Sequence, residues 1–413
     1  MLKRRKLMPL EDRCPLRVMF VITNMPVGGA EILLSELIRR MDRQRFSPEF
    51  CCLKELGPLG EQMAREVPGF SRLIDHKYDW RVLGRLRELF RLRQTDAVIT
   101  VGTGGDKMFW GRLAAWLEGV PVITSALHST GLPDRVERLN RLLTPVTDAF
   151  IGVAAPHGEY LARHEGCPRD KVVVIPNGVD VERFRPRWPA RKLLNEFGLT
   201  AETPVVATVA ALRPEKNHEM LLRVMAEVRR GLSEATLLIV GDGPCRSALE
   251  RQAEGLGIAD GVRFLGTRGD IPEILATADL FALTSHMEAN PVSILEAMAC
   301  EKPVVAPAVG SVPETVLPDC TGYLFPAGDE PSAAAAIVGL LRDGELAGRL
   351  GRAGREEVLR HWSIERMVEG YEQLITDIYE RKLLQRGWRR RSTHAGRTGK
   401  TEPVNVGGGH SGV

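Results

Sequence analysis

Short apolar runs alternate with helical patterns along the first part of the chain. Residues 16–23 form a mostly apolar run that predicts a buried strand, and residues 30–41 place apolar side chains on one helix face. Two glycines, Gly28 and Gly29, predict a turn between them. The alternation continues with expected strands at 49–53, 97–101, 121–126, 149–153 and 172–175 and expected helices at 82–92 and 107–118.

A second series of the same kind follows the segment Pro176–Asp180, whose proline and glycine interrupt the pattern. Its expected strands are 205–210, 236–240, 262–265, 279–283 and 303–306, and its expected helices are 217–230, 245–256 and 291–300. One last long helix is expected at 362–385. Residues 386–413 are rich in Arg, Gly, Ser and Thr, which predicts a flexible end.

The alternation of strands and helices predicts an α/β protein with parallel sheets, because parallel strands need crossover connections. Each series has about the size of one domain, so we expect two Rossmann-like, doubly wound sheets that face each other. The first domain should span 16–177 and the second 178–361. Ligands of such folds bind beyond the carboxyl ends of the strands, which makes the cleft between the domains the expected site.

Composition excludes several classes of protein. A chain of 413 residues is too long for one core, and its 44% apolar and 26% charged residues are ordinary for a globular protein. No apolar run of about 18 residues predicts a transmembrane helix, and residues 1–10 lack the apolar core of a secretory signal. The seven cysteines are widely spaced, which favours reduced thiols in a cytoplasm over disulfides or structural zinc. The net charge of +3 gives no reason to expect nucleic-acid binding.

The segment 285–300 carries the most informative polar pattern. Asn290 is a good N-cap and Pro291 suits the first helical position, so a helix should start there with free amides that point into the cleft. Glu288 precedes this start and Glu296 lies in the second turn. Carboxylates only accept hydrogen bonds, so both side chains suit sugar hydroxyls. Spacing alone nevertheless favours two solvated charges at a helix end.

Three further positions follow expected strands. Arg213 and Lys216 suit phosphate oxygens, although an ordinary charged loop fits them equally well. Gly29 would let backbone amides approach a ligand, although a plain strand-to-helix turn is the simpler explanation. His128 follows a strand on the cleft side, where a lone histidine is more often a packing or surface residue.

Other familiar motifs are weak or missing. Gly241-Asp242-Gly243-Pro244 resembles the start of a dinucleotide fingerprint, but Arg246 stands where the third glycine should be, which disfavours an NAD oxidoreductase. No His-x3-His pair occurs and no Asp-x-Asp motif ends a strand, so no metal is expected. The sequence also has no Gly-x-Ser-x-Gly elbow, so a hydrolase triad has no support.

Taken in order, these segments resemble the retaining glycosyltransferases of family 4, which have the two-domain GT-B fold. The resemblance covers about residues 16–385 and rests on an ordered set of motifs. The motifs are Gly28-Gly29-Ala30-Glu31, His128, Ile175-Pro176-Asn177-Gly178-Val179-Asp180, Arg213 to Lys216, Gly241-Asp242-Gly243-Pro244, the stretch from Phe264 to Asp279, and Glu288-x7-Glu296. This order favours a functional role for the two glutamates, Arg213 and Lys216.

The resemblance implies the transfer of a sugar from a nucleotide sugar to an acceptor hydroxyl, with retention and without a metal or separate cofactor. Arg213 and Lys216 would neutralise the diphosphate, Glu288 would contact the donor sugar, and His128 would sit near the reacting sugar. The other implied donor contacts are Glu296 on the ribose, Arg268 near the base, Gly29 at the phosphates or acceptor, and the helix start Asn290, Pro291 and Val292.

Two further expectations come with the resemblance. The helix 362–385 crosses back onto the first domain in this fold, and Pro176–Asp180 acts with it as a hinge, so the cleft should close on the donor. The family usually has Gly-Phe after the first glutamate of the pair, whereas this chain has Ala289-Asn290, so the sugar pocket is expected to be reshaped.

The expected role is in polysaccharide, lipopolysaccharide or glycolipid assembly, with a glycan or a lipid-linked acceptor. The nucleotide, sugar and acceptor stay open. The alternatives are a nucleotide-sugar epimerase of the same fold and a non-catalytic scaffold.

Charge is unevenly distributed along the chain. Residues 1–15 carry five Lys/Arg and two acids, and residues 381–413 carry eight and one, which leaves −7 for the body between them. Basic, flexible ends on an acidic body predict attraction to an anionic membrane surface, and hence a cytoplasmic enzyme that is peripheral at the inner membrane. Solvated tails that aid solubility are an equal alternative.

Overall fold

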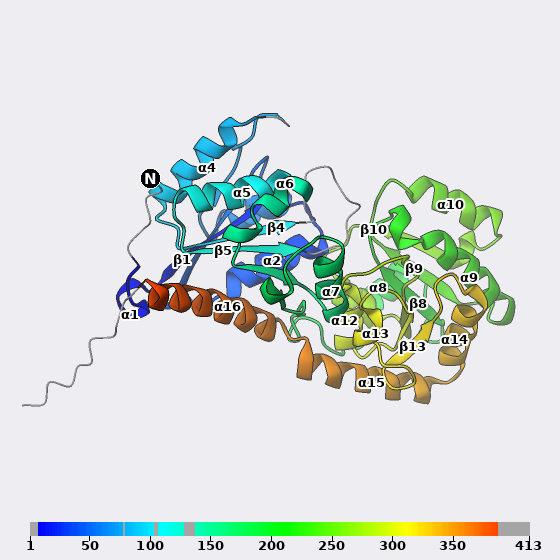
Figure 1. Ribbon diagram of the computed structural model, residues 1–413. Coiled ribbons are helices and arrows are strands. Elements are labelled where there is room, and N and C mark those ends of the chain that lie inside the picture. Colours follow the sequence, from blue (N-terminus) through cyan, green and yellow to red (C-terminus); the bar gives the residue numbers. More distant parts are fainter. Residues whose placement is uncertain (1–6, 77–78, 103–105, 128–136, 387–413) are drawn as a thin grey trace, which may run out of the picture.

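The computed structural model describes residues 7–76, 79–102, 106–127 and 137–386. They form two α/β domains, each a parallel sheet flanked by helices, as Figure 1 shows. The first domain lies at the left of this view and the second at the right, and the long helix α16 (Ile364–Gln385) runs back along the first. This architecture confirms the expected pair of doubly wound sheets.

Within the described residues, the first sheet has seven strands in the order β3-β2-β1-β4-β5-β6-β7. Its strands are β1 (Leu16–Ile22), β2 (Phe46–Cys52), β3 (Gly69–Phe70), β4 (Ala97–Gly102), β5 (Val122–Leu127), β6 (Ala149–Gly152) and β7 (Val172–Val174). Phe20 of β1 pairs in register with Phe50 on one side and Ile99 on the other. Helices cover both faces, so the inner strands are buried except for Gly102 at the end of β4, and they read as mostly apolar runs.

The helices of this domain are α1 (Leu10–Arg13), α2 (Gly29–Arg40), α3 (Gly57–Met63), α4 (Arg81–Leu92), α5 (Asp106–Leu117), α6 (Glu137–Leu142) and α7 (Ala155–Arg163). Two short 3-10 turns, η1 (Thr144–Val146) and η2 (Arg169–Lys171), precede β6 and β7. The boundaries of α2, α4 and α5 lie within one residue of those predicted from apolar spacing.

The second sheet has six strands among the described residues, in the order β10-β9-β8-β11-β12-β13. They are β8 (Val205–Val209), β9 (Thr236–Val240), β10 (Val262–Gly266), β11 (Leu280–Ala282), β12 (Val304–Pro307) and β13 (Gly322–Phe325). The helices are α8 (Arg191–Phe197), α9 (His218–Gly231), α10 (Arg246–Gly255), α11 (Ile271–Ala276), α12 (Val292–Ala299), α13 (Val312–Thr315), α14 (Glu330–Arg342) and α15 (Gly344–His361), with 3-10 turns η3 (Pro214–Lys216) and η4 (Ala259–Gly261).

Helix α16 completes the core of the first domain although it follows the second in sequence. Ile364, Tyr371 and Tyr379 are each at most 3% exposed and belong to the same apolar cluster as Phe20 of β1. The burial of each of these large apolar side chains stabilises the fold by roughly 2 kcal/mol. The packing of α16 therefore ties the end of the described chain to its beginning.

The chain crosses between the domains twice, and the two crossings are bonded to each other. The amide of Val179 donates to the carbonyl of Trp362 (2.9 Å), and the amide of Ile364 donates to the carbonyl of Val179 (2.9 Å). At Gly178, a Cβ atom would lie only 2.5 Å from the Ser363 carbonyl oxygen. Only glycine allows the two segments to lie this close.

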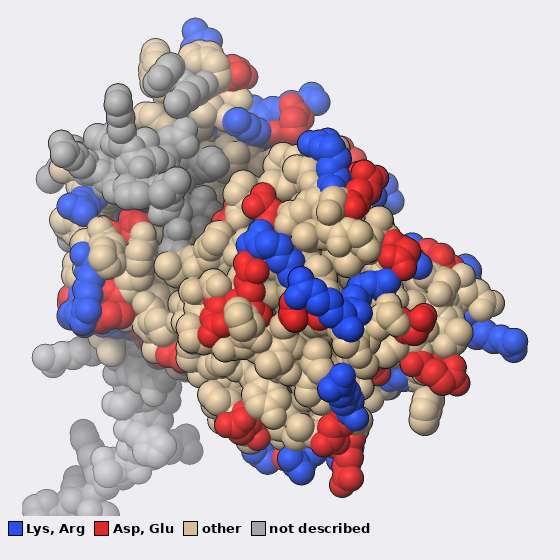
Figure 2. All heavy atoms as spheres, turned by 90° about the vertical axis from the view of Figure 1, so that its right-hand side faces the viewer, with Lys and Arg blue, Asp and Glu red and all other residues tan. Residues whose placement is uncertain are grey.

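The outer surface of the second domain carries charges of both signs. In Figure 2, Lys and Arg side chains lie interspersed with Asp and Glu over the face that is turned to the viewer. Among the described helices, none combines the length and the apolar character needed to cross a bilayer.

Candidate active site between the two domains

Two loops of the second domain meet beside its central strands. Strands β8 and β11 are parallel neighbours, so the loops that follow them leave from the same edge of the sheet. The His286 amide donates to the Glu215 carbonyl (3.0 Å), and the Thr284 hydroxyl donates to the Asn217 carbonyl (2.9 Å). These bonds hold the loop after β8 against the loop after β11.

Among the predicted site residues that the structure describes, Lys216 and Glu288 are in direct contact. The Lys216 ammonium lies 2.6 Å from Oε1 of Glu288, whose side chain is only 7% exposed. The Glu288 backbone is fixed as well, because its carbonyl accepts the Ser311 amide (3.2 Å). Gly310 passes so close that a Cβ there would collide with this carbonyl oxygen, and its φ of +53° also favours glycine.

Helix α12 starts one residue later than the sequence predicts. Its first residue is Val292, and Pro291 occupies the N-cap position with no side-chain cap. Asn290 does not cap because its side chain is buried, at 8% exposure, and its carbonyl accepts the Asn177 side-chain amide (2.9 Å). Its Oδ1 has no hydrogen-bond partner. The first backbone amides of α12 therefore donate no hydrogen bond to the side chain of the N-cap residue.

Val292 places the start of α12 against the first domain. Its side chain is partly exposed and packs against the apolar cluster that contains β1 and α16. The preceding Pro291 is buried. The helix start therefore lies where the two domains meet.

Glu296 lies in the second turn of α12, and its carboxyl group is buried although the residue as a whole keeps some exposed surface. Burial of the carboxyl group raises its pKa to about 7, and the nearby Arg183 opposes this effect. Arg183 itself donates to the Gly269 carbonyl (3.0 Å), and its amide donates to Asp180 Oδ1 (3.0 Å). Arg183 was not predicted as a site residue, although it follows the end of the junction motif at Asp180 by only three positions.

Arg213 faces the first domain from the loop after β8. Its side chain is 62% exposed, and the Glu215 carboxylate is 4.0 Å away. Burial raises the pKa of Glu31 in helix α2, and the positive charge of Arg213 acts in the opposite direction. This coupling shows that the start of α2 and the Arg213 loop lie near each other across the domain boundary.

Gly29 is the first residue of α2, and Gly28 is its extended N-cap. A Cβ atom at Gly29 would find no atom within 4 Å, so the space in front of it is open. A Cβ at Gly28 would collide with Oε2 of Glu31, whose position therefore depends on the glycine. The Glu31 carboxylate therefore lies over the start of α2 beside Gly28, where it also interacts with its own backbone amide.

The guanidinium of Arg268 is held by two carboxylates of the second domain. It contacts Asp270 (2.7 Å) and Glu196 (2.7 Å), and its charge lies 5.8 Å from the centre of the Phe197 ring. These contacts fix the side chain against helix α8, so Arg268 is bound before any ligand arrives. The predicted His128 lies outside the described residues.

Gly241-Asp242-Gly243-Pro244 has a packing explanation in this structure. A Cβ at Gly241 would collide with the Ala210 carbonyl oxygen, and one at Gly243 would collide with that of Leu212. The two glycines thus let the loop after β9 lie against the loop after β8. Next to them, His218 is 3% exposed, and burial lowers its pKa to about 4.

Family models match both domains separately. The model "Glycosyltransferase Family 4" matches residues 27–183, and the model "Glycosyl transferases group 1" matches residues 190–357. The border between the matches, residues 184–189, directly follows the first crossing between the domains. Together the two matches include every described residue discussed above as part of the site.

Curated relatives are similar over part of their length. A GDP-mannose-dependent alpha-(1-6)-phosphatidylinositol monomannoside mannosyltransferase of Mycolicibacterium smegmatis is 38% identical over 46% of this chain and 52% of its own. An N-acetyl-alpha-D-glucosaminyl L-malate synthase of Bacillus anthracis is 29% identical over 63% of this chain and 69% of its own. The matched part spans about half the length of the first relative.

Solved structures share the whole fold. The crystal structure of Anabaena Alr3699/HepE in complex with UDP and glucose has a TM-score of 0.76, at 20% identity, over 88% of this chain and 100% of its own. At this level of identity the likeness shows the fold alone. That fold is the expected GT-B arrangement.

Proposed function

Because the chain belongs to the family 4 glycosyltransferases, we propose that it transfers a sugar from a nucleotide-sugar donor to an acceptor hydroxyl with retention at the anomeric carbon. The observation that carries the proposal is the juxtaposition of Lys216 and Glu288, 2.6 Å apart in the loops that follow neighbouring strands. Arg213 adds an exposed cation that lies near Glu31 at the start of α2.

The charges of these groups suit a leaving diphosphate. Negative charge grows on the diphosphate as the glycosidic bond breaks, so preplaced cations stabilise the transition state more than the ground state. Arg213 and Lys216 would supply this charge together with the uncapped amides of α12. No metal is needed in this scheme, and transfer should survive a chelator.

The carboxylates would orient the donor. Glu288, already paired with Lys216, would accept hydroxyls of the donor sugar, and Glu296 would accept those of the ribose. We assign no covalent nucleophile, because Glu288 is held by Lys216. The departing phosphate would instead take the proton of the acceptor on the same face. Arg268 near the base, Gly29 at the phosphates and His128 near the reacting sugar stay parts of the proposal.

The acceptor would be a growing glycan or a lipid-linked sugar of a polysaccharide, lipopolysaccharide or glycolipid. Two observations support a lipid-linked acceptor. The named mannosyltransferase acts on a phosphatidylinositol mannoside by its own description, and both ends of this chain are basic. Basic ends would hold the enzyme at an anionic inner-membrane surface from the cytoplasmic side.

A thermal-shift screen with UDP-, GDP- and ADP-sugars tests the donor. A donor that binds the folded state raises the melting temperature increasingly as its concentration exceeds its Kd, so the stabilising sugar also identifies the base. NMR of the product made from that donor should show the anomeric configuration of the donor. An inverted product would end the proposal of retention, and loss of transfer in EDTA would end that of metal independence.

Distinguishing transfer from epimerisation needs only the mass balance. Transfer releases free nucleoside diphosphate in step with the glycosylated acceptor, whereas an epimerase leaves the nucleotide attached to the sugar.

Deletion of residues 386–413 should reduce sedimentation with anionic vesicles if the basic end binds membranes. Unchanged sedimentation would end the membrane part of the proposal.

A further inference from the structure

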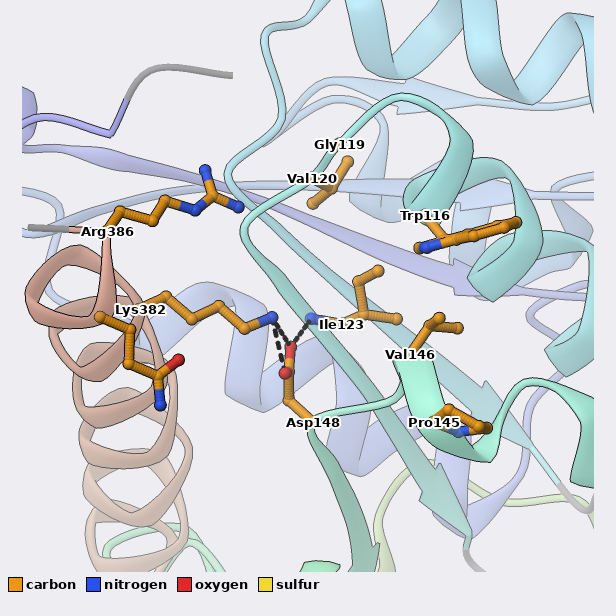
Figure 3. A pocket seen from close by; sticks show the side chains of 10 residues that line it. Trp116, Gly119, Val120, Ile123, Pro145, Val146, Asp148, Lys382 and Arg386 are labelled. Atoms are coloured by element: carbon orange, nitrogen blue, oxygen red, sulfur yellow. Dashed lines mark hydrogen bonds and ion pairs between the residues drawn. The ribbon is translucent and has the colours of Figure 1, made fainter. Parts of the chain in front are cut away.

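A separate pocket lies where the last turns of α16 cross the first sheet. Its volume is about 490 Å³, which is within the range of small-molecule sites. Figure 3 shows Lys382 of α16 and Arg386, the C-cap residue that follows α16, on one side and Trp116 of α5 on the other. Val120, Ile123 and Val146 form part of the apolar lining.

This pocket is at the opposite edge of the sheet from the candidate active site. Ile123 is the second residue of β5, and Asp148 directly precedes β6. Both therefore lie at the amino ends of their strands, whereas the proposed donor site lies beyond carboxyl ends. A ligand in this pocket would be far from the reacting atoms and would not compete with the donor.

The positively charged side of the pocket is partly fixed. The Lys382 ammonium donates to Asp148 Oδ2 (2.6 Å) and to the Pro121 carbonyl (2.7 Å), and Asp148 Oδ2 also accepts the Ile123 amide (2.8 Å). Burial lowers the pKa of Lys382, Asp148 raises it, and the charges of Arg386 and Arg381 lower it further. Lys382 and Arg386 line the pocket together with one acidic residue, Asp148, so the lining carries a net positive charge that attracts an anion.

The other side offers an aromatic surface. Trp116 is 37% exposed, although a large aromatic residue gains from burial, and Figure 3 shows its ring at the wall opposite α16. The guanidinium of Arg386 points over the pocket from the far side. Leu384, between the lining residues Lys382 and Gln385 on α16, has its side chain 67% exposed. An anion and an apolar or ring-shaped group can therefore be bound side by side.

We propose that this pocket binds a phosphate ester, with the phosphate against Arg386 and Lys382 and the organic part against Trp116. Arginine suits phosphate because its planar donors bind two oxygens at once. The same chemistry is present in a soluble sugar or glycerol phosphate and in the head group of an anionic phospholipid. The site lies apart from the cleft, so its failure would leave the proposed transfer reaction untouched.

The test uses the full chain and two kinds of probe. Isothermal titration calorimetry with sn-glycerol 3-phosphate and with inorganic phosphate measures soluble ligands. Co-sedimentation with phosphatidylglycerol–phosphatidylcholine vesicles, against phosphatidylcholine alone, measures the membrane source. The variants are Arg386→Gln, which keeps a polar side chain, and Trp116→Leu, which keeps apolar packing. Arg251→Gln, an exposed arginine of α10, is the matched control.

We expect Arg386→Gln and Trp116→Leu each to weaken binding at least about tenfold for one of the two probe classes, while Arg251→Gln leaves it unchanged. Weaker binding of sn-glycerol 3-phosphate by the two variants would identify a soluble ligand. Weaker binding that is confined to anionic vesicles would identify a lipid head group. Binding of both probes that is equal in all variants, or no binding to either probe, would overturn the proposal. Melting curves of the variants establish that they are folded.

Discussion

The ammonium of Lys216 lies 2.6 Å from Oε1 of Glu288, and these residues come from loops that follow two neighbouring strands of the second sheet. Glu288 is 7% exposed, so Lys216 is an ion-pair partner within a largely buried site. In the proposed reaction the same ammonium also interacts with the diphosphate of the donor. Donor binding would then shift the interactions of Lys216 from one carboxylate toward two phosphates.

Replacing Lys216 by Ala should lower kcat/KM about 10²- to 10³-fold, because it removes one preplaced positive charge from the leaving group. Steady-state kinetics with the identified donor measure this effect. Arg251→Ala, on the outer surface of the second domain, serves as the control and should retain full activity. A Lys216→Ala enzyme that turns over at the normal rate would remove this residue from the site.

Glu296 should make donor binding depend on pH. Its pKa is about 7, so acidification below that value protonates the carboxyl group that would accept the ribose hydroxyls. Donor affinity should fall by up to about tenfold per pH unit as the pH drops below 7. Calorimetric titrations between pH 6 and pH 8, within about one unit of this pKa, would show the change. A Glu296→Gln variant should bind more weakly with little pH dependence from this position.

The same substitution should change stability in the opposite direction. A glutamate ordinarily has a pKa of 4.5, whereas the pKa of Glu296 in the folded protein is about 7. The folded state therefore disfavours the charged form. Its stabilising contribution is complete below pH 4.5 and is lost as the pH rises through 7. Glu296→Gln should therefore gain about 1 to 3 kcal/mol over the native chain at pH 8, but not at pH 4.5. Urea unfolding at both values would test this sign.

Asn290→Leu should separate folding from donor binding. The Asn290 side chain is buried and its Oδ1 lacks a partner, so a side chain of similar shape without the carbonyl avoids a cost of about 1 to 3 kcal/mol. The variant should be at least as stable as the native chain. If Oδ1 accepts a hydroxyl of the donor sugar, the KM for the donor should rise. An unchanged KM would show that Asn290 serves the fold alone.

Lys382→Met should loosen α16 from the first domain. It leaves the Asp148 carboxylate without the ammonium 2.6 Å away, and the pair is mostly shielded from solvent. We expect a loss of about 2 to 3 kcal/mol in the free energy of unfolding, measured with urea. Arg381→Met, an exposed neighbour on the same helix, is the control. Combining Lys382→Met with Asp148→Asn should cost less than the two separate effects together.

Donor binding should close the cleft. Small-angle scattering should show a smaller radius of gyration with the nucleotide sugar than without it. Gly178→Ala should reduce this change, because its Cβ would lie 2.5 Å from the Ser363 carbonyl oxygen and would push the two crossings apart. Gly339→Ala in α14, where a Cβ meets no atom within 4 Å, is the matched control. Identical dimensions with and without the donor would exclude closure.

Helices such as α2, α4 and α5, whose apolar residues are regularly spaced, could be predicted from the sequence, whereas α14 was not predicted. Helix α15 could not be predicted in this way, because its close contacts require glycines, which have no side chain. At Gly351 a Cβ would collide with the Glu301 carbonyl oxygen, and Gly354 lies against Met298 of α12. Glycine weakens the helical signal in a sequence, whereas here it permits close packing.

The candidate site was predictable to a similar degree. The motif order singled out Lys216 and Glu288, which are in contact, but not Arg183, whose influence on Glu296 arises from the fold. The one-residue shift at the start of α12 has a tertiary cause as well. Asn290 would be a good cap in isolation, yet its carbonyl is bound by Asn177, 113 positions earlier in the chain.

Helix α16 has a consequence for protein synthesis. The core of the first domain includes Ile364, Tyr371 and Tyr379, which the ribosome adds only after the whole second domain. The second domain can therefore finish folding while the first still exposes the apolar face that α16 will cover. The completion of α16, and not that of β7, allows the first domain to complete its core, so the domain made first is completed last.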